Sequence, residues 1–183
     1  MFILALCLVA FAGCSSLTQA SNEDHIQQAS HEYYGEGDGA FPNDIALLKF
    51  NESITGPGAA SLVKLPDNDS KNKFAPHRCD ITGWGYTVYG VVLPEVLQQA
   101  KMTVMKEKWC VDVFGEDIIA DGHVCILSDD SSSCNGDSGG PLTCGDTLVG
   151  ITSFGYIGCP PMYPSVYTRV THYRQWIKDN SGI

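Results

Sequence analysis

The stretch Cys134-Asn-Gly-Asp-Ser-Gly-Gly-Pro-Leu142 decides how this sequence is interpreted. A serine between glycines lets the backbone turn sharply, because glycine adopts backbone angles that other residues avoid. Such a turn leaves the N–H groups of Gly136 and Ser138 free to point at one place beside the Ser138 hydroxyl. Two donors of this kind stabilise a negative oxygen, so the pattern indicates an oxyanion hole. A plain glycine-rich turn is the alternative. It is disfavoured because nine residues in this order, with Asp137 directly before the serine, are a poor match to chance.

The rest of the chain is predicted to be mostly β-structure. Segments rich in β-branched and aromatic residues are separated by clusters of Gly, Pro, Asn and Asp, which is typical of an all-β protein. Residues 21–43 are polar and Gly-rich and are expected to form a surface loop. Apolar side chains recur at helical spacing over residues 171–178, which predicts one short C-terminal helix. The expected strands cover residues 45–50, 61–65, 80–91, 98–105, 148–154 and 165–170.

Several segments resemble the trypsin and chymotrypsin family of serine endopeptidases. The sequence from Gly136 to Pro141 is similar to the nucleophile motif of that family. Further segments extend the resemblance over about residues 25–183. They are Asn43-Asp-Ile-Ala-Leu-Leu48, similar to the segment with the triad aspartate; Thr82-Gly-Trp-Gly85, similar to the start of the second barrel; Ser153-Phe-Gly155, similar to the substrate-binding strand; and Tyr167-Thr-Arg-Val170 before the last helix.

The resemblance implies a fold of two β-barrels and peptide-bond hydrolysis through an acyl-enzyme, with no metal and no cofactor. Ser138 would be the nucleophile, Asp44 would orient the imidazole of the general base, and the amides of Gly136 and Ser138 would form the oxyanion hole. The family pattern also implies three disulfides, namely Cys79 with Cys144, Cys110 with Cys125, and Cys134 with Cys159.

Two parts of the family's machinery are missing. The family supplies its general base in an Ala-Ala-His-Cys-like segment well before the aspartate, and none of the five histidines of this chain has that context. His25, His31, His77, His123 and His172 are therefore interpreted as ordinary surface or packing residues. The family's activating N-terminus is also missing. Asp137 is thus expected to lack the ammonium that pairs with it, and its loop is expected to be loosened, as in a zymogen.

The missing part is interpreted as one continuous segment. Both cysteines of the family disulfide beside the catalytic histidine are lost together, which resembles a skipped exon or a gene-model error more than gradual decay. We therefore expect an internally truncated endopeptidase that is inactive or nearly so. Its first barrel would be an incomplete remnant in residues 21–75, and its second barrel would be complete in residues 76–183. The alternative is a secreted binding or decoy protein that does no chemistry.

The resemblance also identifies a substrate pocket. Where trypsin-like members hold an aspartate, this chain has Ser132, so a basic side chain would find no counter-charge. Gly155 would leave the entrance open, whereas Ser165 would narrow the interior. Ser153 and Phe154, the latter in place of the usual Trp, complete the pocket. A medium-sized apolar side chain, as in chymotrypsin or elastase substrates, is predicted to fit best.

Residues 1–20 are predicted to be a signal peptide. The apolar run from Phe2 to Ala12 is too short to span a bilayer and is followed by small residues that suit cleavage at Ala20 or nearer Ser15. A lipoprotein acylated at Cys14 is disfavoured because Phe11 takes the place of the usual leucine. Cleavage would leave six cysteines, and an even number in an exported chain favours disulfides. No two of them are closer than nine residues, which argues against a zinc site.

The composition limits the partners of this chain. It has 183 residues, which suits one ordinary domain, and with 44% hydrophobic residues it can bury a core. Eleven basic and 21 acidic residues give a net charge of −10, which argues against nucleic acid or anionic membrane as a partner. A monomer that meets protein or peptide substrates and protease inhibitors is expected. Sequons at Asn51 and Asn68 would suit glycosylation of an exported protein.

Overall fold

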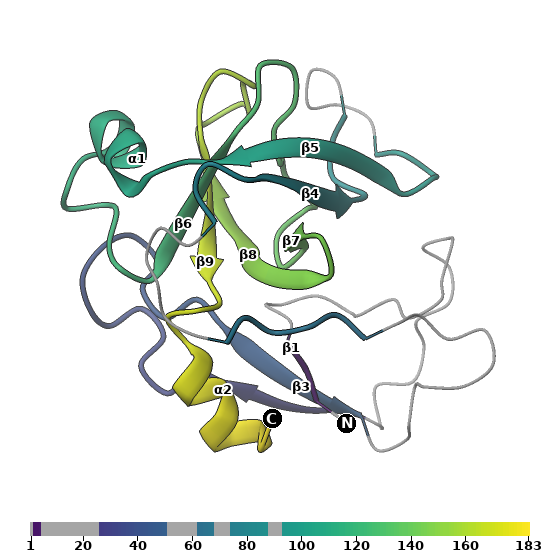
Figure 1. Cartoon of the computed structure of the whole chain (residues 1–183), viewed down its shortest axis with the longest axis vertical. Helices are drawn as coiled ribbons and strands as arrows, with labels where there is room; N and C mark the ends of the chain where they lie inside the picture. The colour runs from purple at the N-terminus through teal and green to yellow at the C-terminus, as the bar shows by residue number, and fades with distance from the viewer. Residues whose placement is uncertain (1, 5–25, 51–61, 68–73, 88–92) are drawn as a thin grey trace.

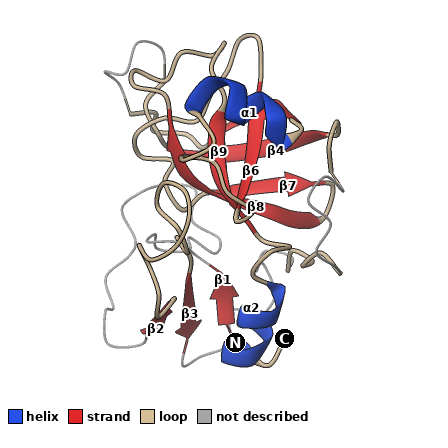
Figure 2. Cartoon of the chain, turned by 90° about the vertical axis from the view of Figure 1, so that its left-hand side faces the viewer, coloured by secondary structure: helices blue, strands red, loops and turns tan. Residues whose placement is uncertain are grey.

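The computed structural model describes residues 2–4, 26–50, 62–67, 74–87 and 93–183. Both sequons and most of the expected signal peptide lie outside these residues. In the described part, a closed β-barrel stands beside a smaller sheet and the C-terminal helix, as Figures 1 and 2 show. No helix among the described residues is long and apolar enough to cross a membrane.

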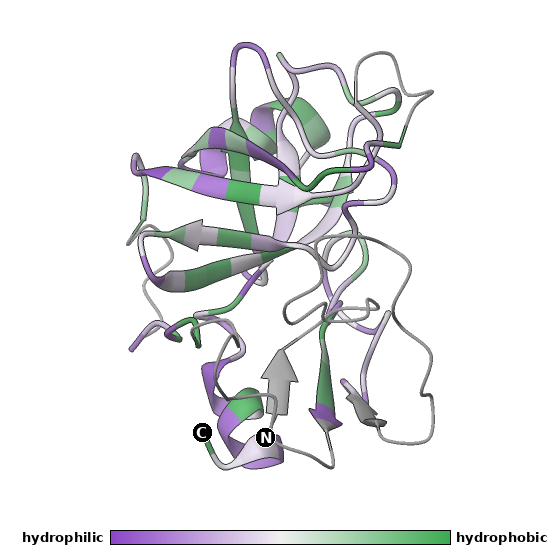
Figure 3. Ribbon diagram, turned by 90° about the vertical axis from the view of Figure 1, so that its right-hand side faces the viewer, coloured by the Kyte–Doolittle hydropathy of each residue, from purple (hydrophilic) through white to green (hydrophobic). Residues whose placement is uncertain are grey.

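Six antiparallel strands close the barrel in the order β4-β5-β6-β9-β8-β7. The barrel closes where β4 pairs with β7, with Asp80 opposite Thr143. Polar and apolar residues alternate along Arg78–Gly83, because successive side chains of a strand point to opposite faces. Figure 3 shows hydrophobic and hydrophilic residues along the strands of the barrel. The strands are β4 (Arg78–Gly83), β5 (Gln98–Val104), β6 (His123–Leu127), β7 (Pro141–Cys144), β8 (Thr147–Gly155) and β9 (Ser165–Arg169).

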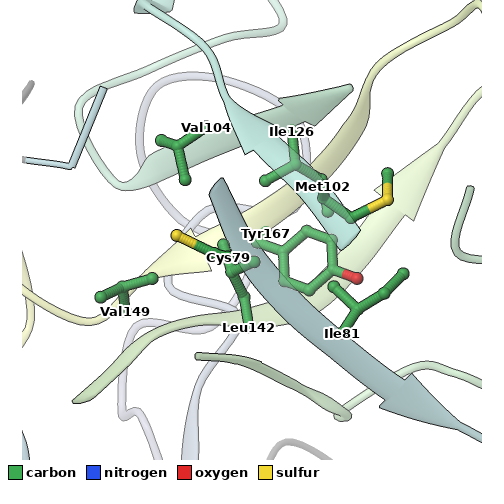
Figure 4. Packing of buried hydrophobic residues seen from close by; sticks show 8 residues of the cluster. All are labelled: Cys79, Ile81, Met102, Val104, Ile126, Leu142, Val149 and Tyr167. Atoms are coloured by element: carbon green, nitrogen blue, oxygen red, sulfur yellow. The ribbon is translucent and has the colours of Figure 1, made fainter. Parts of the chain in front are cut away.

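The interior of the barrel is filled by side chains from all six strands. Tyr167 is fully buried, and burial raises the pKa of its hydroxyl to about 12. Figure 4 shows it surrounded by aliphatic and sulfur-containing side chains that point toward one another. The buried members of this cluster are Cys79, Ile81, Met102, Val104, Ile126, Leu142, Val149 and Tyr167.

The three expected disulfides are confirmed. Cys79–Cys144 joins β4 to β7, Cys110–Cys125 joins a helix to β6, and Cys134–Cys159 joins two loops at one end of the barrel. Their sequence separations are 65, 15 and 25 residues. In the chain-entropy model, closing a 15-residue loop stabilises a protein by roughly 3 kcal/mol, so the second barrel is strongly supported by its disulfides.

The smaller sheet contains three strands in the order β1-β3-β2. Its central strand β3 (Ala46–Phe50) agrees with the expected strand 45–50. The edge strand β2 (Ile26–Ser30) lies within residues 21–43, so the prediction of a loop throughout that segment is wrong. The other edge strand, β1 (Phe2–Leu4), comes from the expected signal peptide.

A shared hydrophobic core attaches this sheet to the barrel. Ile45 and Leu47 are each 1% exposed and pack with residues of β8 and of the C-terminal helix α2 (Arg174–Ser181). The other buried members of this core are Leu148, Ile151, Val170, Tyr173 and Ile177. The described residues of the small sheet and of the segment just before β3 therefore do bury apolar side chains.

Local sequence patterns failed to reveal three further elements, namely β6, β7 and the helix α1 (Glu107–Phe114). Alpha1 contains several residues that favour strands, and its helical form is supported by an ion pair one turn apart between Lys108 and Asp112. Its buried Cys110 is tied to β6 by a disulfide. The expectation of a single helix is thus wrong, because distant contacts override weak local propensity.

Two expected strands are shorter than predicted. Of residues 61–65, the described part makes only an isolated bridge from Lys64 to Thr147. The strand expected over 80–91 ends at Gly83, and residues 88–92 are outside the described part. The expected helix over 171–178 is confirmed as α2, which begins three residues later, at Arg174.

We expect Ile45→Ala to destabilise the whole chain by about 2–5 kcal/mol, the usual effect of truncating a buried isoleucine. Denaturant unfolding of the oxidised protein measures this change. Leu62→Ala, at a position that is 66% exposed, is the control and should change stability by less than about 0.5 kcal/mol. An effect of Ile45→Ala as small as that of the control would mean that the segment leading into β3 contributes nothing to the core.

Candidate functional site

Ser138 lies exposed in the turn that precedes β7. Gly136 and Gly139 have φ angles of 98° and 77°, which only glycine adopts without strain. The turn is closed by backbone hydrogen bonds from Asp137 N to Cys134 O and from Gly140 N to Asp137 O, at 2.9 and 2.8 Å. Within the described part of the chain, the amides of Gly136 and Ser138 have no acceptor. Both donors are therefore available to an oxygen beside Ser138.

The Asp137 carboxylate fixes this turn against the end of β4. Its oxygens accept hydrogen bonds from Gly85 N at 2.8 Å and from Cys134 N at 2.9 Å. A Cβ atom on Gly83 or Gly85 would overlap the carboxylate, which explains both glycines of the Thr-Gly-Trp-Gly segment. We expected Asp137 to lack a partner and its loop to be loosened, but two amides bind the carboxylate, although no described cation does.

Asp44 lies just before β3 and is bound to the barrel at two atoms. Its Oδ2 accepts a hydrogen bond from Ser153 Oγ, and its backbone oxygen accepts one from Thr168 Oγ1, both at 2.7 Å. Asn43, which precedes it, has a φ of 57°, a conformation that asparagine tolerates better than most residues. Burial raises the pKa of the Asp44 carboxyl, and the Ser153 hydrogen bond opposes this rise.

No hydrogen bond joins a histidine to Asp44 or Ser138 among the described residues. His31 stacks on Trp176 with ring centroids 5.0 Å apart. His123 is buried, and burial lowers the pKa of its imidazole. These packing roles fit the interpretation of the histidines made from the sequence. Of the other three, His77 and His172 are described and His25 is not.

Ser132 lines a cleft of about 710 Å³ at one end of the barrel. Its hydroxyl donates a 2.6 Å hydrogen bond to the backbone oxygen of Cys159. Asp137 also lines this cleft. The expected pocket residues other than Ser132 do not line it, and these are Ser153, Phe154, Gly155 and Ser165. Those residues lie at the paired ends of β8 and β9, where Gly155 is opposite Ser165 and a Cβ on Gly155 would meet nothing closer than 3.9 Å. The structure thus brings Gly155 and Ser165 together beside Ser153 and Phe154, and it places Ser132 in the neighbouring cleft.

An aromatic group around Phe154 was not predicted. Its ring lies near Phe41, Phe114 and His123, with centroid distances of 5.6, 5.9 and 5.5 Å. Phe41 is 55% exposed despite its size, so part of this group faces solvent. The only sequence feature that could have pointed to this group is that Phe41 lies three residues before Asp44.

A second aromatic pair follows β8. Tyr156 stacks on Tyr163 with centroids 4.1 Å apart, and Tyr156 also lies near Phe114. Ile157 and Met162, between them in sequence, are 93% and 80% exposed. The end of β8 is therefore bordered by a largely apolar surface that could hold the side chains of a peptide. The described residues contain no group of three or more His, Cys, Asp or Glu side chains that could bind a metal ion.

Comparisons with known proteins agree with one another. A family model described as trypsin matches residues 12–177, so the match begins inside the expected signal peptide. Fibrinolytic enzyme isozyme C of Lumbricus rubellus is 41% identical over 180 residues, which cover 91% of this chain and 73% of the relative. Trypsin-1 of Astacus astacus is 39% identical over 145 residues, covering 76% and 60%. A chymotrypsin-like serine proteinase of Haliotis rufescens is 35% identical over 176 residues, covering 88% and 67%.

The solved structures include a similar fold. Neuropsin, a serine protease expressed in the limbic system of mouse brain, aligns with a TM-score of 0.81 at 28% identity, over 98% of this chain and 84% of that one. The matched part of the chain spans about 60–73% of the length of the three relatives from Lumbricus, Astacus and Haliotis.

Asp44→Asn is expected to stabilise the protein at neutral pH. A raised carboxyl pKa means that the folded state holds a proton which the unfolded state has released, so stability falls as pH rises from the ordinary value of 3.8 through the folded-state pKa. The amide carries no charge to desolvate and can still accept the Ser153 hydrogen bond. The variant should therefore have a higher melting temperature than the wild type at pH 7. Near pH 3 the two melting temperatures should be equal.

Asp38→Asn, which changes an exposed carboxylate in the same segment, is the control. An Asp44→Asn protein that is less stable than the wild type at pH 7 would contradict this reasoning.

Proposed function

The chain belongs to the trypsin family of serine proteases, and we propose that it is a shortened endopeptidase of chymotrypsin or elastase type that is inactive or nearly so. The observation that carries the proposal is the environment of Asp44. Its carboxylate accepts the Ser153 hydroxyl at 2.7 Å, as an aspartate that orients an imidazole would, yet no described histidine is bonded to it.

The proposed chemistry requires a base, and no described histidine is bonded to Asp44 or Ser138. Ser138 Oγ would attack the carbonyl carbon of the peptide, and the amides of Gly136 and Ser138 would stabilise the oxyanion that forms. The serine proton must pass to a base and then to the departing amine, and this is the task of the family's histidine. Without it, turnover in a Ser-His-Asp enzyme falls on the order of a million-fold, while the oxyanion donors are retained.

The proposed specificity is for apolar side chains before the cut bond. The hydroxyl of Ser132 is engaged by the Cys159 carbonyl, so this position offers neither a negative charge nor a free donor. Ser165 is 2% exposed opposite Gly155, which supports a pocket of limited depth with an open entrance. Leu, Met, Phe and Tyr would be preferred over Lys and Arg, and Trp would be disfavoured.

We further propose that the protein is exported as a monomer after removal of residues 1–20. Three observations support export, namely the three disulfides, the apolar leader and the family itself. Disulfides persist mainly in oxidising compartments. Protein or peptide substrates and protease inhibitors would be its partners, and no cofactor is required.

A non-catalytic binding or decoy protein is the second candidate. The exposed apolar surface formed by Phe41, Tyr156, Ile157 and Met162 favours it, because such a surface can hold a peptide whether or not a base is present.

The first test measures labelling of Ser138 by a fluorophosphonate at neutral pH. We expect no stoichiometric labelling of the purified chain, with Ser138→Ala as the background control. A family member with an intact triad confirms that the reagent is active. Full labelling that Ser138→Ala abolishes would refute the proposed inactivity and would mean that another group acts as the base.

The second test concerns specificity in a chain to which the family's missing segment has been restored and whose zymogen has been cleaved. On matched substrates, kcat/KM should be higher for Leu than for Arg, because an unpaired ammonium is costly to bury. Ser132→Asp should move the preference toward Lys and Arg. An Arg preference above about tenfold without that substitution, equivalent to 1.4 kcal/mol, would contradict the proposed pocket.

A further inference from the structure

The hydroxyl of Thr168 reaches from the barrel to Asp44. Thr168 lies on β9 and is 2% exposed, and its Oγ1 donates a 2.7 Å hydrogen bond to the Asp44 backbone oxygen. A buried hydroxyl needs a hydrogen-bond partner. Among the described residues, the Asp44 backbone oxygen is the only hydrogen-bond partner of the Thr168 hydroxyl. The bond therefore connects one barrel strand to a residue that lies just before β3 of the small sheet, 124 positions earlier in the chain.

Asp44 is held by two neighbouring strands of the barrel. Thr168 of β9 binds its carbonyl, and Ser153 of β8 binds its carboxylate. These strands pair directly, as Figure 1 shows, with Ile151 opposite Thr168, and Ser153 lies where the register shifts between Thr152 and Phe154. The two hydroxyl groups therefore come from adjacent strands of one sheet. Two bonds to separate atoms of one residue restrict its rotation as well as its position.

From this geometry we propose that Thr168 is a positioning residue, which holds Asp44 so that its carboxylate meets Ser153 and would face an imidazole in a complete site. The role rests on the proposed function, because Asp44 would have an imidazole to orient only in a complete protease of this family. Thr168 would not itself touch the substrate or the reacting atoms. It would act through Asp44, because its bond to the Asp44 carbonyl fixes the direction of the peptide unit between Asp44 and Ile45.

A merely structural role makes a different prediction. If Thr168 only satisfies a buried carbonyl, its loss should lower stability and leave the Ser153–Asp44 bond unchanged. If it positions Asp44, its loss should also weaken that bond. The Ser153 hydrogen bond opposes the effect of burial on the Asp44 carboxyl, so weakening it should raise the pKa of Asp44 further.

The experiment is a pH titration of the Asp44 carboxyl by NMR in the full chain labelled at its aspartate carboxyl carbons. Asp44→Asn identifies the signal, and Ser153→Ala gives the shift for complete loss of the bond. We expect Thr168→Val to raise the pKa by about half a unit or more, toward the value of Ser153→Ala. Thr168→Ser keeps the hydroxyl and should titrate like the wild type. Tyr173, whose pKa is raised by burial and by Asp44, titrates far higher and is followed separately.

Thr152→Val is the matched control. Thr152 is also a buried threonine of the barrel, and its hydroxyl donates to a different backbone oxygen, that of Gly140, at 3.1 Å. Its loss should leave the Asp44 titration unchanged. Should Thr168→Val not fold, Thr168→Ala removes the same hydroxyl without adding a methyl group, and the same outcomes apply.

An Asp44 pKa that stays at the wild-type value in the hydroxyl-free variant, whatever happens to the melting temperature, would overturn the positioning role. So would an equal shift in Thr152→Val. Failure of the proposed inactivity is a separate result, because fluorophosphonate labelling of Ser138 would reveal it while the Asp44 titration would still report on Thr168.

Discussion

The carboxylate of Asp137 is the constraint on which the candidate site depends. It accepts two backbone amides, Gly85 N and Cys134 N, and so joins the turn around Ser138 to the end of β4. The close approach is possible only because Gly83 and Gly85 have no side chain. Hydrogen bonds to a charged group are among the stronger ones in proteins, about 1.5–3 kcal/mol each. Here they hold the turn that contains the amides of Gly136 and Ser138, for which the described residues offer no acceptor.

Unlike the Asp137 carboxylate, which holds the turn in place, the buried carboxylate of Asp44 lowers the stability of the fold at neutral pH. Burial raises the pKa of its carboxyl, so its charge opposes folding at neutral pH, and a Ser153 hydroxyl offsets only part of this effect. Such a residue is expected where function outweighs stability. In a complete site an imidazolium would be the natural partner of this carboxylate. In the proposed shortened chain the unfavourable charge remains without the catalytic benefit.

The shared hydrophobic core explains how the small sheet stays attached to the barrel. Ile45 and Leu47 contribute to the same hydrophobic cluster as Ile177 of the last helix, and Trp176 donates its indole N–H to Glu32 at 2.9 Å. These contacts join the beginning and the end of the described chain. Residues 21–75 are thus better anchored, in their described part, than an isolated barrel fragment would be.

The sequence by itself determined the family, the all-β character, the turn around Ser138 and the terminal helix, because short motifs and periodic apolar residues encode these features locally. The three disulfides also followed from the family resemblance. Only the tertiary structure decided that Asp137 is bound by amides, that Thr168 reaches Asp44, and that α1 is a helix. The bonds from Gly85 to Asp137 and from Thr168 to Asp44 join residues 52 and 124 positions apart, and no local pattern records such contacts. The helical form of α1 was not recorded either, because several of its residues favour strands and its Cys110 is tied to β6 by a disulfide.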